Sequence, residues 1–216
     1  MHLRALTVLL LAASFLLGCS SVYYDTMEKF GFAKREILVD RVEEARESQQ
    51  AAKDQFASAL EKFIAITRVE TGELKDRYDQ LNRELTRSEQ RAGEVRERIE
   101  SVHDVSDALF NEWKEELKQY SDPQLRRESE RQLDQTRRRY DDLMATMQSA
   151  ARRMEPILAK FRDQVLFLKH NLNAQAIAGL STTTRGLQED ISRLIDDMER
   201  SIREADEFIR AMQTDR

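Results

Sequence analysis

The chain has little cysteine, proline or glycine, and these shortages exclude several classes of protein. Cys19 is the only cysteine, so no disulfide within the chain can support the fold. Two prolines and six glycines in 216 residues leave long stretches without a helix breaker. Strand-type alternation of apolar and polar residues is absent, while charged residues make up 35% of the chain. This composition is typical of long helices and coiled coils, and it predicts an all-α fold.

The residues that enzymes and metal sites need are also scarce. His103 and Asp107 lie one helical turn apart, but no second pair of ligands accompanies them, so we expect no metal site. No phosphate-binding loop occurs, and no serine has a histidine partner in a recognisable motif. The net charge of −5 argues against nucleic acid as a partner. The sequence therefore predicts a protein that is not an enzyme and uses no cofactor.

A short apolar leader opens the chain and ends at its single cysteine. His2 and Arg4 form a weakly basic start, and residues 5–17 are almost wholly apolar. These thirteen residues are too few to span a bilayer, which needs about 20. Leu16-Leu17-Gly18-Cys19 resembles the lipobox of bacterial lipoproteins, in which the leader is cleaved before the cysteine and the cysteine is acylated.

This resemblance predicts a signal peptide over 1–18, cleavage between Gly18 and Cys19, and a membrane anchor on Cys19. It also predicts that 19–34 is a lipid-anchored segment, with no long Gly/Ser tether. Two other interpretations are open: Cys19 follows an ordinary secretory leader, or it is buried at a helix end. No second hydrophobic stretch approaches membrane-spanning length, so the acyl chains would be the only firm anchor.

The remainder of the chain, 35–216, carries four long runs of apolar residues at alternating spacings of three and four. They predict helices over about 35–70, 73–120, 123–178 and 182–213. The first run is Leu38, Val42, Ala45, Gln49, Ala52, Phe56, Ala59, Phe63 and Ile66. Turns are expected at Gly72, Ser121-Asp122-Pro123 and Gly179.

Short connections make neighbouring helices antiparallel, so we expect an elongated four-helix bundle with coiled-coil heptad seams. The same seams could instead join copies of the chain into a homo-oligomer. Pro156 falls within the third helix, where it removes a hydrogen bond. Because the apolar run continues through this proline, a kink is favoured over a break.

We pair residues of neighbouring antiparallel helices that are equally far from the turn between them. This pairing leaves residues 107–138 without the other two helices beside them, so we expect a two-helix hairpin that extends past the bundle. A cluster of large apolar residues in this hairpin is the candidate interaction site: Phe110, Trp113, Tyr120 and Leu125. A two-helix hairpin buries less apolar surface than a bundle, so it is the part that most needs a partner.

The start of the third helix is rich in arginine. Such a cluster could meet phosphate groups or an acidic partner, or it could be a solvated face with ion pairs at i,i+4, which is the more frequent case. Aromatic residues near the anchor allow a similar pair of interpretations: they sit among lipid headgroups, or they cover the hairpin and the bundle core. The arginines are Arg126, Arg127, Arg131, Arg137, Arg138 and Arg139, and the aromatics are Tyr23, Tyr24, Phe30 and Phe32.

A second candidate site lies in residues 163–180, where Asp163 and Lys169 are the only charged residues. Apolar residues surround this helix, so we expect it to be buried on all sides. His170, Asn171 and Asn173 are set into this stretch as a candidate polar cluster. They would form either a buried hydrogen-bond network or a pocket for a ligand.

Several strings in the chain resemble an uncharacterised family of Gram-negative bacterial lipoproteins, a domain of unknown function. They are Met27-Glu28-Lys29-Phe30-Gly31, Lys34-Arg35-Glu36-Ile37-Leu38-Val39-Asp40-Arg41-Val42, and the segment from Asp163 to Ala174. The resemblance covers about 23–212 and implies a helical envelope lipoprotein, with no catalytic residues to carry over. In the wider lipoprotein class, Ser20 after the cysteine resembles the signal for the outer membrane.

The sequence thus predicts a lipid-anchored, periplasm-facing scaffold of the cell envelope, attached to the inner leaflet of the outer membrane through acylated Cys19. Its other expected partner is an envelope protein, which the sequence does not identify. Two alternatives are a module that binds a lipid or another ligand near Phe167, His170 and Asn173, and a regulator of an envelope enzyme.

Overall fold

Four long helices pack side by side in the computed structural model, which describes residues 34–68, 74–170 and 174–214. The helices are α3 (Lys34–Arg68), α4 (Leu74–Glu116), α5 (Pro123–His170) and α6 (Ala174–Thr214), and a short 3-10 helix, η1 (Leu117–Gln119), follows α4. The side chains of 67–68, 74 and 174–183 lie outside this description. The all-helical prediction is confirmed for the described residues.

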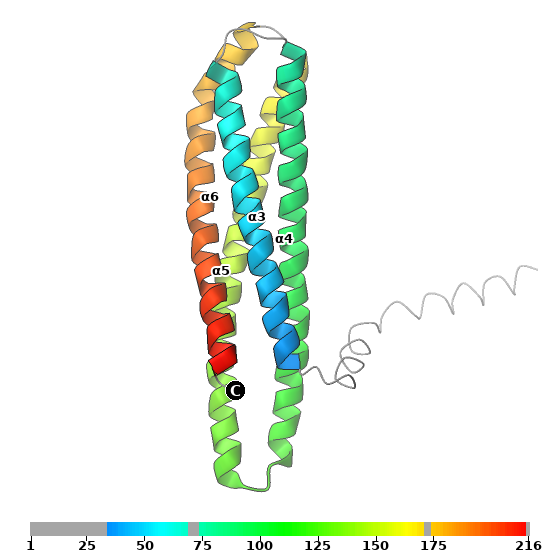
Figure 1. Cartoon of the computed structure of the whole chain (residues 1–216), viewed down its shortest axis with the longest axis vertical. Coiled ribbons are helices and arrows are strands. Elements are labelled where there is room, and N and C mark those ends of the chain that lie inside the picture. The colour runs from blue at the N-terminus through cyan, green and yellow to red at the C-terminus, as the bar shows by residue number, and fades with distance from the viewer. Residues whose placement is uncertain (1–33, 69–73, 171–173, 215–216) are drawn as a thin grey trace, which may run out of the picture.

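Each helix packs against two neighbours, so the four form a closed ring around one core. Helix α3 lies between α4 and α6, and α5 lies on the other side of the same two helices (Figure 1). Ion pairs join neighbouring antiparallel helices: Arg98 of α4 lies 2.9 Å from Glu44 of α3, and Arg46 of α3 lies 2.8 Å from Asp206 of α6. Short connections make each helix antiparallel to the next one in the chain, and α6 is therefore antiparallel to α3 as well.

The apolar run of α3 supplies its buried face. All nine positions of that run are buried, from Leu38 to Ile66, and they include the polar Gln49. At one end of the bundle the core is filled by aromatic rings, where Phe63 meets Phe161 of α5 edge-to-face with 5.8 Å between the ring centres. Alanines occupy many buried positions nearer the middle and allow the helices to approach closely. Whether the packing is a coiled coil in the strict sense stays a prediction.

The third and fourth helices differ from the prediction in where they end and begin. Helix α5 ends at His170 rather than 178, and α6 begins at Ala174 rather than 182. The cross-helix ion pairs Lys160–Asp190 and Arg153–Asp197 each join residues that are equally far from residue 175, whereas the prediction placed the turn at Gly179.

The prediction took Gly179 as a helix end, but a glycine costs a helix only about 1 kcal/mol, and α6 continues through it. Pro156 lies inside α5, and the helix continues on both sides of it, so a break is excluded.

The α4–α5 hairpin extends beyond the other two helices, as predicted. Lys34, the first residue of α3, binds Glu112 of α4 with 3.0 Å between Nζ and Oε1. Arg35 donates to the backbone carbonyl of Met212 at 2.9 Å, so α6 ends at the same height. Of the described elements, only α4, η1 and the start of α5 continue past this level (Figure 1).

Candidate functional site

The interior of the α4–α5 hairpin is held by aromatic residues that face each other. Phe110 and Tyr140 meet edge-to-face with 5.4 Å between ring centres. The guanidinium of Arg137 lies over the Phe110 ring, 5.6 Å from its centre, in a cation–π contact. Burial raises the pKa of the Tyr140 hydroxyl above its usual range. Phe110 is buried, so of the predicted interaction residues it is one that packs inside the protein rather than on its surface.

Trp113 connects the two arms of the hairpin, one helical turn closer to its end than Phe110. Its indole Nε1 donates a hydrogen bond to the hydroxyl of Ser129 on α5 at 2.8 Å. Leu117 and Leu133 are buried in the same region, one from each arm of the hairpin. The half-buried Trp113 therefore stabilises the hairpin from within and shows only part of its ring to solvent.

The end of the hairpin is built around the start of α5. The carboxylate Oδ1 of Asp122 accepts hydrogen bonds from the backbone N–H groups of Gln124 at 2.7 Å and Leu125 at 3.3 Å. Asp122 is therefore the N-cap, and Pro123 occupies the first helical position, where its missing N–H costs nothing. The sequence predicted a turn at residues 121–123, and the structure identifies Asp122 as its capping residue.

Two large apolar side chains stand exposed at this end. Tyr120 is 43% exposed and Leu125 is 57% exposed. We call residues 117–127 the hairpin tip. Its charged residues are three basic side chains and the capping Asp122, in a chain whose net charge is −5. The basic residues are Lys118, Arg126 and Arg127.

The arginines of the hairpin are largely solvated and paired within their own helix. Arg126 binds Glu130 with 3.0 Å between Nε and Oε1, and Arg131 pairs with Glu128. Arg137 contacts the Phe110 ring instead of serving only as a surface charge. These contacts agree with the interpretation of a solvated face rather than a ready-made anion site.

The opposite end of the bundle differs from the prediction of a helix buried on all sides. Val165 and Leu168 are buried, but Leu166 is 49% and Phe167 46% exposed. His170 is also exposed, so it is not part of a buried network. The prediction was wrong because α5 ends at His170, which places this stretch at the end of the bundle, with one side facing solvent. Asn171 and Asn173 lie outside the described residues.

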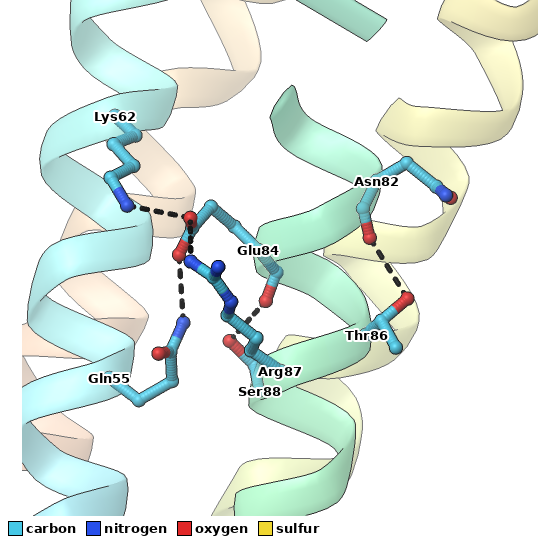
Figure 2. A network of polar contacts seen from close by, with 7 residues as sticks. All are labelled: Gln55, Lys62, Asn82, Glu84, Thr86, Arg87 and Ser88. Atoms are coloured by element: carbon cyan, nitrogen blue, oxygen red, sulfur yellow. Dashed lines mark hydrogen bonds and ion pairs between the residues drawn. The ribbon is translucent and has the colours of Figure 1, made fainter. Parts of the chain in front are cut away.

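A polar network that the sequence did not single out centres on Glu84 (Figure 2). The side chain of Glu84 is only 5% exposed, at the contact between α3 and α4. Its carboxylate accepts hydrogen bonds from Lys62 at 2.6 Å and Gln55 at 2.9 Å on α3, and from Arg87 at 3.1 Å on its own helix. Burial by itself raises the pKa of Glu84, but the donors from Lys62 and Gln55 outweigh it and hold the pKa below its ordinary value of 4.5.

The Glu84 network has the features of a structural contact that holds α3 against α4, rather than those of a reactive site. The carboxylate is ionised near neutral pH and already bound to cationic and amide donors, so it is a poor general base. Its two long-range partners lie on α3, so it fixes the register of α3 against α4. Nothing in the sequence marks Glu84 out among the 40 acidic residues, because its partners are far away along the chain.

A second buried polar group lies in the middle of the bundle. The side chain of Gln49 is fully buried in α3, and its amide has no hydrogen-bond partner among the described residues. Ser201 of α6 is also fully buried, and its hydroxyl likewise has none within the described ranges. Other buried polar side chains, such as Ser88 and Ser106, donate to backbone carbonyls of their own helix.

A shallow groove of about 600 Å3 runs along the outside of α4 and α5. Arg96, Gln148 and Arg152 line it together with Ile99 and Ala151, and it is open to solvent. Phe167 and His170 do not line this groove, so the predicted ligand site near them is not built into it.

Metal ligands do not converge in the part of the chain that the structure describes. His103 Nδ1 and Asp107 Oδ2 are 3.8 Å apart and both exposed. Across 34–68, 74–170 and 174–214, no three side chains of histidine, cysteine, aspartate or glutamate come together in a way that suits a metal ion.

The predicted lipidation site lies outside the described residues, as do both residues of the predicted cleavage site, Gly18 and Cys19. Within the described residues, none of the helices combines the length and apolar character that crossing a membrane requires.

Comparison with known proteins gives one match. The model of the family described as "Protein of unknown function (DUF2959)" matches residues 23–212. No curated protein and no solved structure matches the chain. The match covers the bundle except for its last two residues, and the chain therefore belongs to DUF2959, a family of proteins of unknown function.

Proposed function

We propose that this protein is a lipid-anchored, non-enzymatic scaffold of the bacterial cell envelope, held at the outer membrane and facing the periplasm. The observation that carries the proposal is the combination of Leu16-Leu17-Gly18-Cys19 with a bundle of long helices, whose described part begins at Lys34. At 1.5 Å per residue, the 48 residues of α5 make a rod about 70 Å long. Such a body is suited to holding a binding surface away from a membrane.

The end far from Lys34 is the surface we assign to a protein partner. Leu166 and Phe167 are both about half exposed there. Apolar side chains of this size are usually covered when they lie together at an exposed end. Side chains on the outer faces of the bundle are instead charged and paired, as in Arg162–Glu89 at 2.6 Å.

The ligand-binding alternative has less support. It needs an enclosed, mostly apolar site, because such a site buries most of the surface of a small ligand. Phe167 and His170 are exposed, and the groove between α4 and α5 is open to solvent. Mass spectrometry of the gently purified protein would reverse this preference if it found a ligand bound at one copy per chain.

Two experiments in cells test the proposal. A clickable fatty-acid analogue should label the wild-type chain and leave Cys19→Ser unlabelled, and membrane fractions should contain only the former. A photo-crosslinking residue at Phe167 should capture a defined envelope protein, while the same residue at the exposed Gln188, on the side of α6, serves as the matched control. An unlabelled wild-type chain would refute the anchor, and equal crosslinking patterns at the two positions would refute the docking end.

A further inference from the structure

We propose that the hairpin tip is a membrane-contact surface, which rests on the phospholipid bilayer that holds Cys19. The inference rests on the proposed lipid anchor and adds a specific role for residues 117–127. It assigns the two exposed apolar residues at this end, Tyr120 and Leu125, to lipid rather than to a protein partner.

The first step is the position of the chain entry. Lys34 begins α3 and binds Glu112, so the segment that leads back to Cys19 joins the bundle at the hairpin end. From this level the hairpin continues to Ser121, which is nine residues farther and about 14 Å at helical rise. The hairpin tip therefore projects beyond the point where the anchor segment enters (Figure 1).

The second step compares lengths. Fourteen residues separate Cys19 from Lys34, and even a fully extended segment of that length reaches only about 50 Å. Helix α3 has 35 residues and is about 52 Å long. Bringing the far end of the bundle to the bilayer would require the segment to run extended along all of α3, at a large cost in conformational entropy. The hairpin end reaches the same bilayer with most of that length to spare.

The third step is the chemistry of the surface. Among the described residues, the large apolar side chains that are exposed are Tyr120 and Leu125 at the tip, and Leu166 and Phe167 at the far end. A bundle lying on its side would therefore present charged faces to the lipid. Tyrosine suits the membrane interface, because its ring is apolar and its hydroxyl remains hydrated.

Charge at the tip is largely balanced and adds little to this orientation. Lys118 binds Glu115 with 2.6 Å between Nζ and Oε2, and Arg126 binds Glu130 with 3.0 Å between Nε and Oε1. The carboxylate of Asp122 accepts hydrogen bonds from the backbone at the start of α5. The orientation therefore follows from the chain entry, the lengths and the exposed apolar side chains.

The absence of a second cysteine makes a direct test simple. When Cys19 is acylated, a cysteine introduced elsewhere is the only free thiol. Ser121→Cys places a label at the tip without removing Tyr120 or Leu125, and Lys169→Cys places the same label at the far end; both positions are exposed. The acylated full-length mature chain is labelled with an environment-sensitive fluorophore and reconstituted into vesicles of phosphatidylethanolamine and phosphatidylglycerol.

We expect the label at position 121 to shift to shorter wavelength in vesicles and to be quenched by brominated phospholipids, while the label at position 169 stays water-exposed. Adding Tyr120→Ser and Leu125→Ser should lower the ratio of membrane-bound to free tips about tenfold or more, because each half-exposed side chain contributes about fivefold on burial. The matched control, Leu166→Ser with Phe167→Ser, makes a similar change at the far end and should leave the label at 121 unaffected. Circular dichroism should show the same helix content in all variants.

Two results would separate the inference from the function on which it rests. A chain that fails to float with the vesicles, with Cys19 unmodified by mass spectrometry, contradicts the proposed anchor. A chain that floats with a water-exposed label at position 121 contradicts only the membrane contact.

A label already shielded without vesicles would also overturn the inference. If the shielding did not vary with protein concentration, residues 20–33 would cover the tip. If it rose with concentration, a second copy of the chain would cover it.

Discussion

Replacing Glu84 with glutamine tests the contact that holds α3 against α4. The substitution keeps the size of the side chain but removes the charge that accepts hydrogen bonds from Lys62, Gln55 and Arg87. A hydrogen bond to a charged group contributes about 1.5–3 kcal/mol to stability. Lys62 and Arg87 are 45% and 56% exposed, so water replaces part of what they lose. We expect the free energy of unfolding to fall by about 1–2 kcal/mol, which lowers Tm by about 2–8 °C in a chain of this size.

The effect of Glu84→Gln should depend on pH in a defined direction. The pKa of Glu84 is lowered in the folded protein, so its contribution is fully present above its ordinary pKa of 4.5 and is lost as the pH falls through the folded value. The difference between wild type and variant should therefore be constant above about pH 5 and shrink below about pH 4.

Urea unfolding followed by circular dichroism at several pH values measures this difference. The matched control is Glu89→Gln, the same change in the same helix at a more exposed ion pair with Arg162. This control should cost less than about 0.5–1 kcal/mol, as exposed pairs do. The account would be contradicted if the two variants lost the same free energy of unfolding, or if the loss for Glu84→Gln did not shrink in acid. Either result would show that Glu84 is not a buried, ionised carboxylate that stabilises the contact between α3 and α4.

Three further substitutions test the core and the hairpin by the same unfolding assay. Gln49→Leu should raise the free energy of unfolding by about 1–3 kcal/mol, because it removes a fully buried amide that has no partner among the described residues; a loss of stability would contradict this. Phe63→Ala should cost about 3–5 kcal/mol, since it leaves a cavity against Phe161, and a cost under about 1 kcal/mol would mean that the end of the bundle is loosely packed. Asp122→Ala should cost about 1 kcal/mol and Asp122→Asn much less, and equal costs for the two would argue against the N-cap.

The regular part of the fold could be predicted from the sequence because it follows from periodicity. The apolar run from Leu38 to Ile66 identifies the buried face of α3 at every position, and the turn around residues 121–123 is identified by its capping aspartate and proline. The α5–α6 turn was misplaced by eight residues, because Gly179 is a stronger local signal than the Asn171-Leu172-Asn173 segment that separates the two helices. Helix α6 contains both Gly179 and Gly186, because packing in the bundle offsets the roughly 1 kcal/mol that each glycine costs.

The candidate sites could be predicted only where local sequence sets the exposure. Tyr120 and Leu125 flank the predicted turn, and both are exposed at the hairpin tip. Their role as an interaction site stays a prediction. Phe110 and Trp113 belong to the same sequence cluster, yet their ring and hydrogen-bond partners come from the other arm of the hairpin. The Glu84 network depends on contacts from 22 and 29 residues away, so no local pattern reveals it.

The height of the protein above a supported bilayer tests most directly whether this chain is a lipid-anchored spacer that stands upright on the membrane. Neutron reflectometry on the acylated chain should show a protein layer about 70 Å thick when the bundle is upright, and more than about 50 Å even at a tilt of about 45°. The layer should be absent for Cys19→Ser. A layer of about 20 Å, the width of two packed helices, would mean that the bundle lies flat on the membrane, and a layer that forms equally well without Cys19 would contradict the lipid anchor.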